Sequence, residues 1–130
     1  MDCIFCKIVN GDIPSYTLYE DDIVKVFLDI DPKTNGDALI IPKKHFNNLV
    51  DIDLETLNHI NKISKAIYEL LKNKLNCEGL TIIQNNDYGQ EVKHYHVHLT
   101  PRYKNDLLNH EYNKDLLQSI DEVFKTIKEE

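Results

Sequence analysis

Hydrophobic positions recur along this chain with two spacings, one typical of strands and one typical of helices. Period-two alternation, or a short apolar run ended by turn residues, predicts strands at residues 17–20, 23–30, 38–41 and 80–83. Spacings of three and four predict helices at residues 2–10, after Asp53, and near the C-terminus. This mixture predicts an α+β fold built on an antiparallel sheet.

The longest helix is expected to begin after Asp53, a favourable N-cap residue, and to run to Leu75. Its apolar stripe predicts a core-facing surface made by Leu54, Leu57, Ile60, Ile63, Ile67, Leu70 or Leu71, and Leu75. His59 lies off this stripe and is expected to be solvated. Residues 80–83 read as a buried strand. A second amphipathic helix is predicted from Leu116, Leu117, Ile120, Val123, Phe124 and Ile127.

Three of the six histidines, His94, His96 and His98, lie at alternate positions of one segment. In a strand, alternate side chains share a face, so these imidazoles would project together, with Pro101 marking the strand's end. Three interpretations fit this pattern. It could be a solvated strand face, a metal site, or a nucleophilic imidazole flanked by two helper imidazoles.

The chain has three cysteines, and Cys3 and Cys6 form a C-x-x-C pair. A redox pair of this type usually follows a strand, and no strand can precede Cys3. Two zinc ligands are therefore the better interpretation, but such a site needs two further ligands. His45 follows the strand at 38–41 as a lone histidine. From this position alone, we expect it to be a surface residue.

Composition narrows the function classes. The length of 130 residues suits a single domain, and the net charge of −7 argues against nucleic-acid binding. No apolar run is long enough for a membrane span, and the acidic start is unlike a secretory signal. With an odd cysteine count, this predicts a cytoplasmic protein. Only Arg102 is an arginine, so a phosphate site would depend on imidazoles and backbone N–H groups.

The segment His94–Thr100 matches the pattern His-φ-His-φ-His-φ-φ, where φ is apolar. Together with further stretches, it resembles the zinc-containing bacterial branch of the histidine triad family of nucleotide hydrolases and transferases. Those stretches are residues 3–8, 13–14, 19–22, 27–30, 40–45 and 89–90. The resemblance covers about residues 2–104 of one predicted domain, 1–130. The C-terminal helical extension, about 113–129, lies outside it.

The resemblance implies a homodimer whose two sheets join into one. It also implies a purine mononucleotide site with an AMP-like ligand. His96 would be the nucleophile and His98 a partner that binds the phosphate. Phe27 and Ile30 would line the base pocket and Asp29 would accept hydrogen bonds from the ribose. The residues implied around the phosphate are Asn85, Gly89 and Gln90.

The same resemblance implies a structural zinc ion held by Cys3, Cys6, His45 and His94. His94 would then be removed from catalysis. Glu91 departs from the family, which usually has a small hydroxyl residue at this position, and its charge is expected to repel phosphate.

The activity implied is cleavage of a P–N or P–O bond at the α-phosphorus of adenosine phosphoramidates or related nucleotides. Dinucleoside polyphosphate hydrolysis is one alternative. A nucleotide- or zinc-binding regulatory protein with weak activity is another. A zinc hydrolase that uses all three strand histidines is the third.

Overall fold

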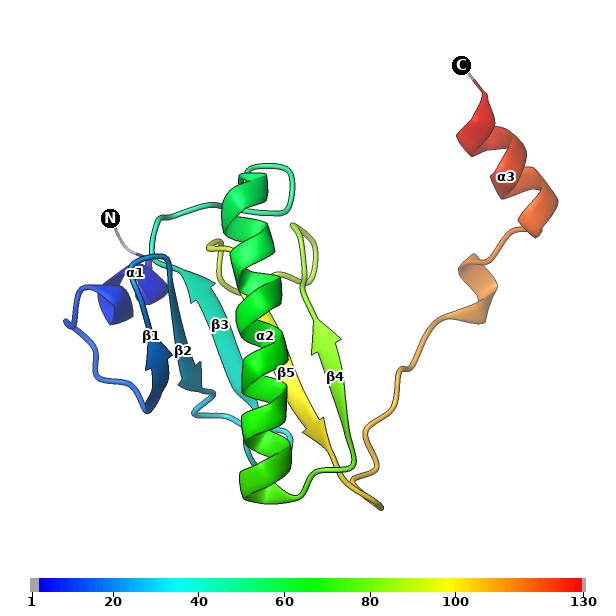
Figure 1. Cartoon of the computed structure of the whole chain (residues 1–130). Coiled ribbons are helices and arrows are strands. Elements are labelled where there is room, and N and C mark those ends of the chain that lie inside the picture. The colour runs from blue at the N-terminus through cyan, green and yellow to red at the C-terminus, as the bar shows by residue number, and fades with distance from the viewer. Residues whose placement is uncertain (1–2, 130) are drawn as a thin grey trace.

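Five strands form one antiparallel sheet in the order β1-β2-β3-β5-β4 in the computed structural model, which describes residues 3–129 (Figure 1). The strands are β1 (Thr17–Glu20), β2 (Val24–Leu28), β3 (Ala38–Pro42), β4 (Gly79–Ile83) and β5 (Val97–Arg102). The helices are α1 (Ile4–Val9), α2 (Leu54–Leu75), a 3₁₀ turn at Lys114–Leu116 and α3 (Ile120–Lys128). The predicted α+β class is therefore confirmed.

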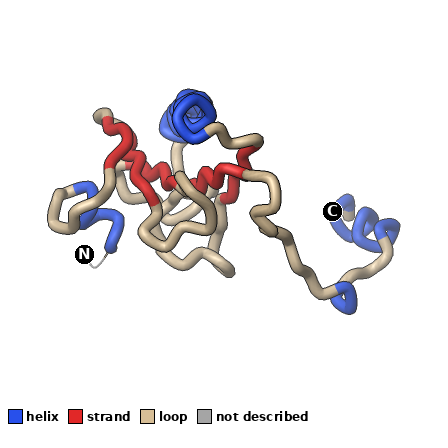
Figure 2. The backbone as a smooth tube through the Cα atoms, turned by 90° about the horizontal axis from the view of Figure 1, so that it is seen from below, coloured by secondary structure: helices blue, strands red, loops and turns tan. Residues whose placement is uncertain are grey.

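The two faces of the sheet carry different layers, as the alternation along the strands requires. Figure 2, seen along α2, shows this helix on one face and α1 with several loops on the other. Val26, Ile40 and Leu99 pack under α2 in the main core, while Phe27 and Leu39 pack under α1 in a smaller cluster. One residue of offset thus decides whether a side chain faces α2 or the opposite side.

The predicted cap of the long helix is confirmed. The Asp53 side chain accepts a hydrogen bond from the backbone N–H of Thr56, and the helix ends at Leu75 before Asn76, which adopts a left-handed conformation. His59, expected to be solvated, is instead half-buried, with Nε2 2.7 Å from Asp21 Oδ2. The partner precedes the helix by more than thirty residues, so helical periodicity alone gives no sign of it.

The strand with the triad histidines begins later than predicted. Only His98 lies in β5, whereas His94 and His96 belong to the irregular segment before it. The last pair between β3 and β5 is Ile40 with Val97, so continued pairing would set Pro42, which lacks an N–H, opposite Tyr95. The N–H of Tyr95 bonds instead to the carbonyl of Phe46, 2.6 Å away.

Pro101 does not end β5, because the strand runs one residue further to Arg102 and Pro101 is paired with Leu80 of β4. The strand β4 is not buried as predicted. It lies at the edge of the sheet, and its Ile82 is 59% exposed.

The C-terminal segment leaves the body of the protein after β5 and carries α3 away from it (Figures 1 and 2). The predicted helix is divided into the 3₁₀ turn and α3, and neither contains a buried residue. Arg102 holds the start of this segment through hydrogen bonds to Asp106 and to the carbonyl of Leu108. Across the described residues, no helix is both long and apolar enough to cross a membrane.

Candidate active site and metal centre

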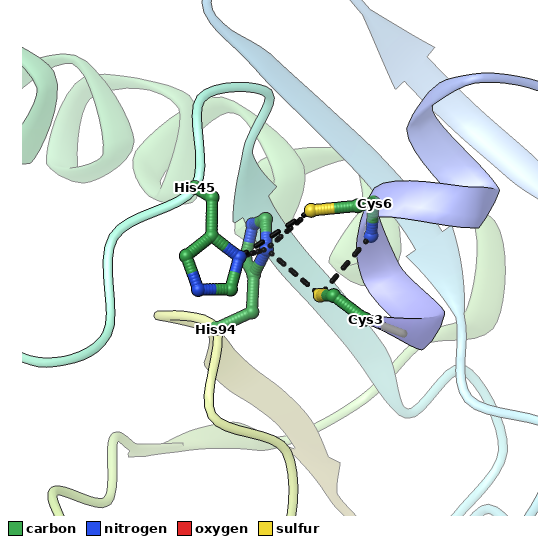
Figure 3. Close-up of side chains that lie close together, drawn as sticks. All are labelled: Cys3, Cys6, His45 and His94. Carbon is green, nitrogen blue, oxygen red and sulfur yellow. Dashed lines mark hydrogen bonds between the residues drawn. The ribbon is translucent and has the colours of Figure 1, made fainter. Parts of the chain in front are cut away.

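Four side chains that could bind a metal ion meet at one end of the sheet (Figure 3). Cys3 caps α1 and Cys6 lies in its first turns, while His45 follows β3 and His94 precedes β5. Their ligand atoms all lie within 4.8 Å of one another. The site thus joins three segments that are far apart in the sequence, and His45 is no longer an isolated surface histidine.

The hydrogen bonds of the two rings define which nitrogen carries the proton. Nε2 of His94 lies 2.8 Å from the carbonyl oxygen of Pro42, which can only accept, so Nε2 is the protonated nitrogen. Nε2 of His45 is likewise paired with Oδ1 of Asn47 at 3.0 Å. Both Nδ1 atoms therefore present lone pairs, and they face each other across 3.2 Å.

This arrangement fits a tetrahedral metal ion. Sulfur and nitrogen ligands around zinc would lie roughly 3.3–3.8 Å apart. The observed separations are 3.4 Å for Cys3 Sγ–His94 Nδ1, 3.3 Å for Cys6 Sγ–His45 Nδ1 and 3.6 Å for Cys6 Sγ–His94 Nδ1. Burial lowers the pKa of His94 to about 4, which keeps its ring neutral. A cation between the facing lone pairs would remove their repulsion.

A cavity of about 490 Å³ opens on the same face of the sheet as the cluster. This volume suits a small-molecule ligand of nucleotide size. Phe27, Asp29 and Ile30 contribute to its wall from the end of β2 onward, and His96 and His98 contribute from β5 and the segment before it. The cavity therefore combines apolar surface with two imidazoles and with acidic side chains such as that of Asp29.

His96 is the buried imidazole of this cavity, with 4% of its surface exposed. Its Nδ1 donates to the carbonyl of His94 at 2.8 Å, so its Nε2 carries the lone pair. Burial lowers the pKa of His96, although Glu91 and Asp29 act in the opposite direction. The ring of Phe5 packs edge-on against it at 5.0 Å between centroids. A neutral, fixed imidazole with a free nitrogen is suited to nucleophilic attack.

His98 lies on β5, next to His96 along the cavity wall. The two ring centroids are 5.0 Å apart, and His98 is more exposed than His96. Backbone pairing with Leu39 and Ile83 on either side holds its position. Two imidazoles can therefore contact one ligand group from the same side.

A family model described as the HIT domain matches residues 10–105, which is most of the chain. This chain belongs to the HIT family. The resemblance inferred from the histidine motif is thereby confirmed, and the match includes β1 to β5 and α2.

The relatives of this HIT protein differ in how much is known of them. An uncharacterized HIT-like protein of Methanocaldococcus jannaschii is 43% identical over 97% of this chain and 98% of its own length. The adenosine 5′-monophosphoramidase HNT1 of Saccharomyces cerevisiae is 42% identical over 77% of this chain and 62% of its own. A Zn-bound histidine triad protein from Mycobacterium smegmatis is 36% identical, with a TM-score of 0.80 over 88% of this chain and 85% of that one.

Most of the binding residues that the motif implied lie at the cavity of this HIT protein. Phe27, Asp29, Ile30, Asn85 and Gly89 all line it, as do both candidate catalytic histidines. Gln90 is the exception. Its buried side chain bonds to the carbonyl of Asn47 and to the N–H of Asp87, so it braces two loops instead of forming the wall.

A buried polar pair beside the triad was not predicted from the sequence. Asp37 is 2% exposed, and its carboxylate accepts hydrogen bonds from the hydroxyl of Thr100 at 2.8 Å and from the N–H of Lys33 at 3.0 Å. Its carbonyl accepts from the N–H of Asp29. Asp37 therefore anchors the loop that carries Asp29. The only signal in the sequence is an acidic residue directly before a fully apolar strand.

Proposed function

We propose that this HIT protein is a nucleotide hydrolase that acts on adenosine phosphoramidates or related purine nucleotides. It cleaves the P–N or P–O bond at their α-phosphorus. The observation that carries the proposal is the free Nε2 of the neutral, buried His96 at a cavity of nucleotide size. Its similarity to a yeast adenosine 5′-monophosphoramidase favours this substrate class.

The residues of the cavity divide among the parts of such a nucleotide. We assign the base to Phe27 and Ile30, and the ribose hydroxyls to Asp29. One Asp29 oxygen already accepts the N–H of Asp31 at 2.9 Å, which holds the carboxylate in place. We assign the α-phosphate to His96 and His98, with the loop residues Asn85 and Gly89 closing the site. Gln90 contributes by holding this loop.

The reaction proceeds in two displacements. The lone pair on Nε2 of His96 forms a bond to the α-phosphorus, while the bond from phosphorus to the leaving amine or oxygen breaks with its electron pair. The leaving group takes up a proton. Water then attacks the phosphorus, the bond to Nε2 breaks, and the products are a nucleoside monophosphate, a proton and a neutral ring. His98 beside the phosphate would donate a hydrogen bond that offsets its charge.

The proposed metal is a structural zinc ion bound by Cys3, Cys6, His45 and His94. The facing lone pairs of the two rings and the observed spacing of the four donors support this assignment. A Zn-bound family member of similar fold adds to it. Zinc would fix the segment before β5, and it takes no part in the displacement. Thiolate ligands persist in a reducing compartment, so we propose a cytoplasmic location.

The orientation of His94 separates this function from a zinc hydrolase that uses all three triad histidines. Nδ1 of His94 points to the cysteines and Nε2 to the carbonyl of Pro42, so neither nitrogen is available to the cavity. Dinucleoside polyphosphate hydrolysis remains the second candidate, because the same nucleophile would serve it.

We also propose the homodimer implied by the family, with two sheets joined at β4. This strand is at the edge of the sheet, and its Ile82 is exposed. Exposed strand edges readily pair with another chain. Light scattering would detect the dimer, and Ile82→Lys should make the protein monomeric. A monomeric wild-type protein would contradict this proposal.

Turnover of adenosine 5′-phosphoramidate tests the proposed activity. His96→Ala should lower kcat by roughly 10⁴-fold, since it removes the nucleophile. His110→Ala, which changes an exposed histidine outside the matched domain, is the control and should leave kcat unchanged. Comparable activity in His96→Ala and the wild type, or no activity in the wild type, would reject the proposal.

A further inference from the structure

The charge around the cavity is unusual for a protein proposed to bind a phosphate ester. Four acidic residues line it, and Lys33 is the single lysine or arginine among the described lining residues. The carboxylate of Asp37 is already engaged with Thr100 and the N–H of Lys33. Lys33 itself belongs to the loop that carries Asp29 and Asp31. The remaining acidic residue, Glu91, enters the cavity from a different segment.

Glu91 is exposed and has no cationic partner among residues 3–129. The nearest lysine in sequence, Lys93, is directed elsewhere, since its Nζ donates to the carbonyls of Asp87 at 2.8 Å and Gln90 at 3.1 Å. The carboxylate of Glu91 therefore presents an uncompensated negative charge to the ligand cavity.

The proposed binding mode assigns Glu91 to no part of the nucleotide. Phe27, Asp29 and Ile30 come from the end of β2 and the loop after it, and they take the nucleoside in the proposed binding mode. Glu91 comes from the loop before β5, in the same segment as His96, and both residues line the same cavity. In the proposed binding mode, the leaving group is the one part of the substrate that has no assigned partner.

We infer that Glu91 selects substrates whose leaving group carries a positive charge, such as an amine or an aminoacyl group with a free ammonium. The inference rests on the proposed function and narrows it to one substrate class. A cationic leaving group would pair with Glu91 and balance its repulsion of the α-phosphate. A second nucleotide attached through a polyphosphate would bring further negative charge to the same carboxylate, so dinucleoside polyphosphates would be poor substrates.

Three adenosine 5′-phosphoramidates of nearly equal size test this inference. Their N-substituents are 2-aminoethyl, propyl and carboxymethyl, which are cationic, neutral and anionic at neutral pH. The wild type should show kcat/KM in the order cationic, neutral, anionic, with about fivefold between the first two. The preference should weaken with added salt, since exposed charges are screened.

The variant Glu91→Gln should remove this order, lowering kcat/KM for the cationic substrate and raising it for the other two. Glu69→Gln, an exposed position on α2, is the matched control and should keep the wild-type order. A wild type that cleaves all three equally, or a Glu91→Gln variant that keeps the preference, would overturn the inference alone. A wild type that cleaves none of them would reject the proposed function and the inference with it.

Discussion

The Nδ1 of His96 donates a hydrogen bond to the main-chain carbonyl of His94, 2.8 Å away, while the His94 side chain belongs to the Cys/His cluster. His94 therefore links the candidate nucleophile, through its main chain, to the candidate metal centre, through its side chain. This bond sets the tautomer of His96, and its geometry depends on where the His94 backbone is held. The metal centre can thus support catalysis without contacting the substrate.

Loss of the metal should therefore reduce activity indirectly. In Cys6→Ser we expect zinc content to fall well below one ion per chain and kcat to drop by about 10-fold, as for other changes in groups that support a site. Metal analysis and steady-state kinetics on the same preparation check this. Cys77→Ala, which alters the cysteine outside the cluster, should retain both zinc and kcat. A metal-free Cys6→Ser protein with full kcat would contradict the link.

Loss of the hydrogen bond from His45 to Asn47 should weaken zinc binding less than loss of a zinc ligand. Asn47→Ala removes the acceptor that orients the His45 ring, and zinc affinity should fall about 10-fold. Competition with a chromophoric chelator measures it. Asn61→Ala, on the exposed surface of α2, is the control. Equal affinities of the two variants would show that this bond does not support zinc binding.

A prediction about stability concerns Asp21. Burial alone would raise the pKa of Asp21, but hydrogen bonds from His59, from the N–H groups of Val24 and Ile23, and from Tyr19 outweigh it, so its pKa lies well below the usual value. A lowered pKa stabilises the fold above the unfolded-state pKa of about 4, and this contribution is lost as the pH falls further.

Asp21→Asn should therefore lower the free energy of unfolding by about 2 kcal/mol at pH 7. Its difference from the wild type should shrink as the pH is lowered from about 4 towards 2. Urea denaturation at several pH values measures this, with the exposed neighbour Asp22→Asn as control. A difference that stays constant over this range would show that the charge of Asp21 is not what stabilises the turn.

The hydrogen bond from Thr100 to the buried Asp37 allows us to predict how much one hydroxyl group contributes to stability. Thr100→Val keeps the shape but removes one donor to a buried carboxylate, so we expect a loss of about 1–3 kcal/mol in the free energy of unfolding. KM for the phosphoramidate should rise, because Asp37 also anchors the backbone of Asp29. Thr126→Val on α3 is the control. Unchanged stability and KM in Thr100→Val would show that the hydrogen bond to Asp37 does not support the site.

The local signals of this sequence predicted its local structure well. Strands are found at the four predicted ranges, and Asp53 was correctly identified as the cap of α2. These features depend on residues within a few positions of one another. The family motif then extended the prediction to His45, which no local pattern connects to Cys3 and Cys6.

The errors arose where a distant partner decides the structure. The start of β5 depends on Pro42 in the opposing strand. The burial of His59 on α2 depends on Asp21, which lies in the turn between β1 and β2. The exposure of β4 follows from its place at the edge of the sheet, which composition does not reveal. Periodicity also predicted a C-terminal amphipathic helix but not that its apolar face would lie away from the core.

Whether His96 is the nucleophile is tested most directly by mass spectrometry of the protein quenched during turnover of adenosine 5′-phosphoramidate. We expect an adenylyl group attached to the peptide that contains His96. This adduct should be absent in His96→Ala and persist in His110→Ala. Acid-labile P–N bonds require quenching and digestion at high pH. Product accumulation with no nucleotide attached to His96 at any time point would show that His96 is not the nucleophile.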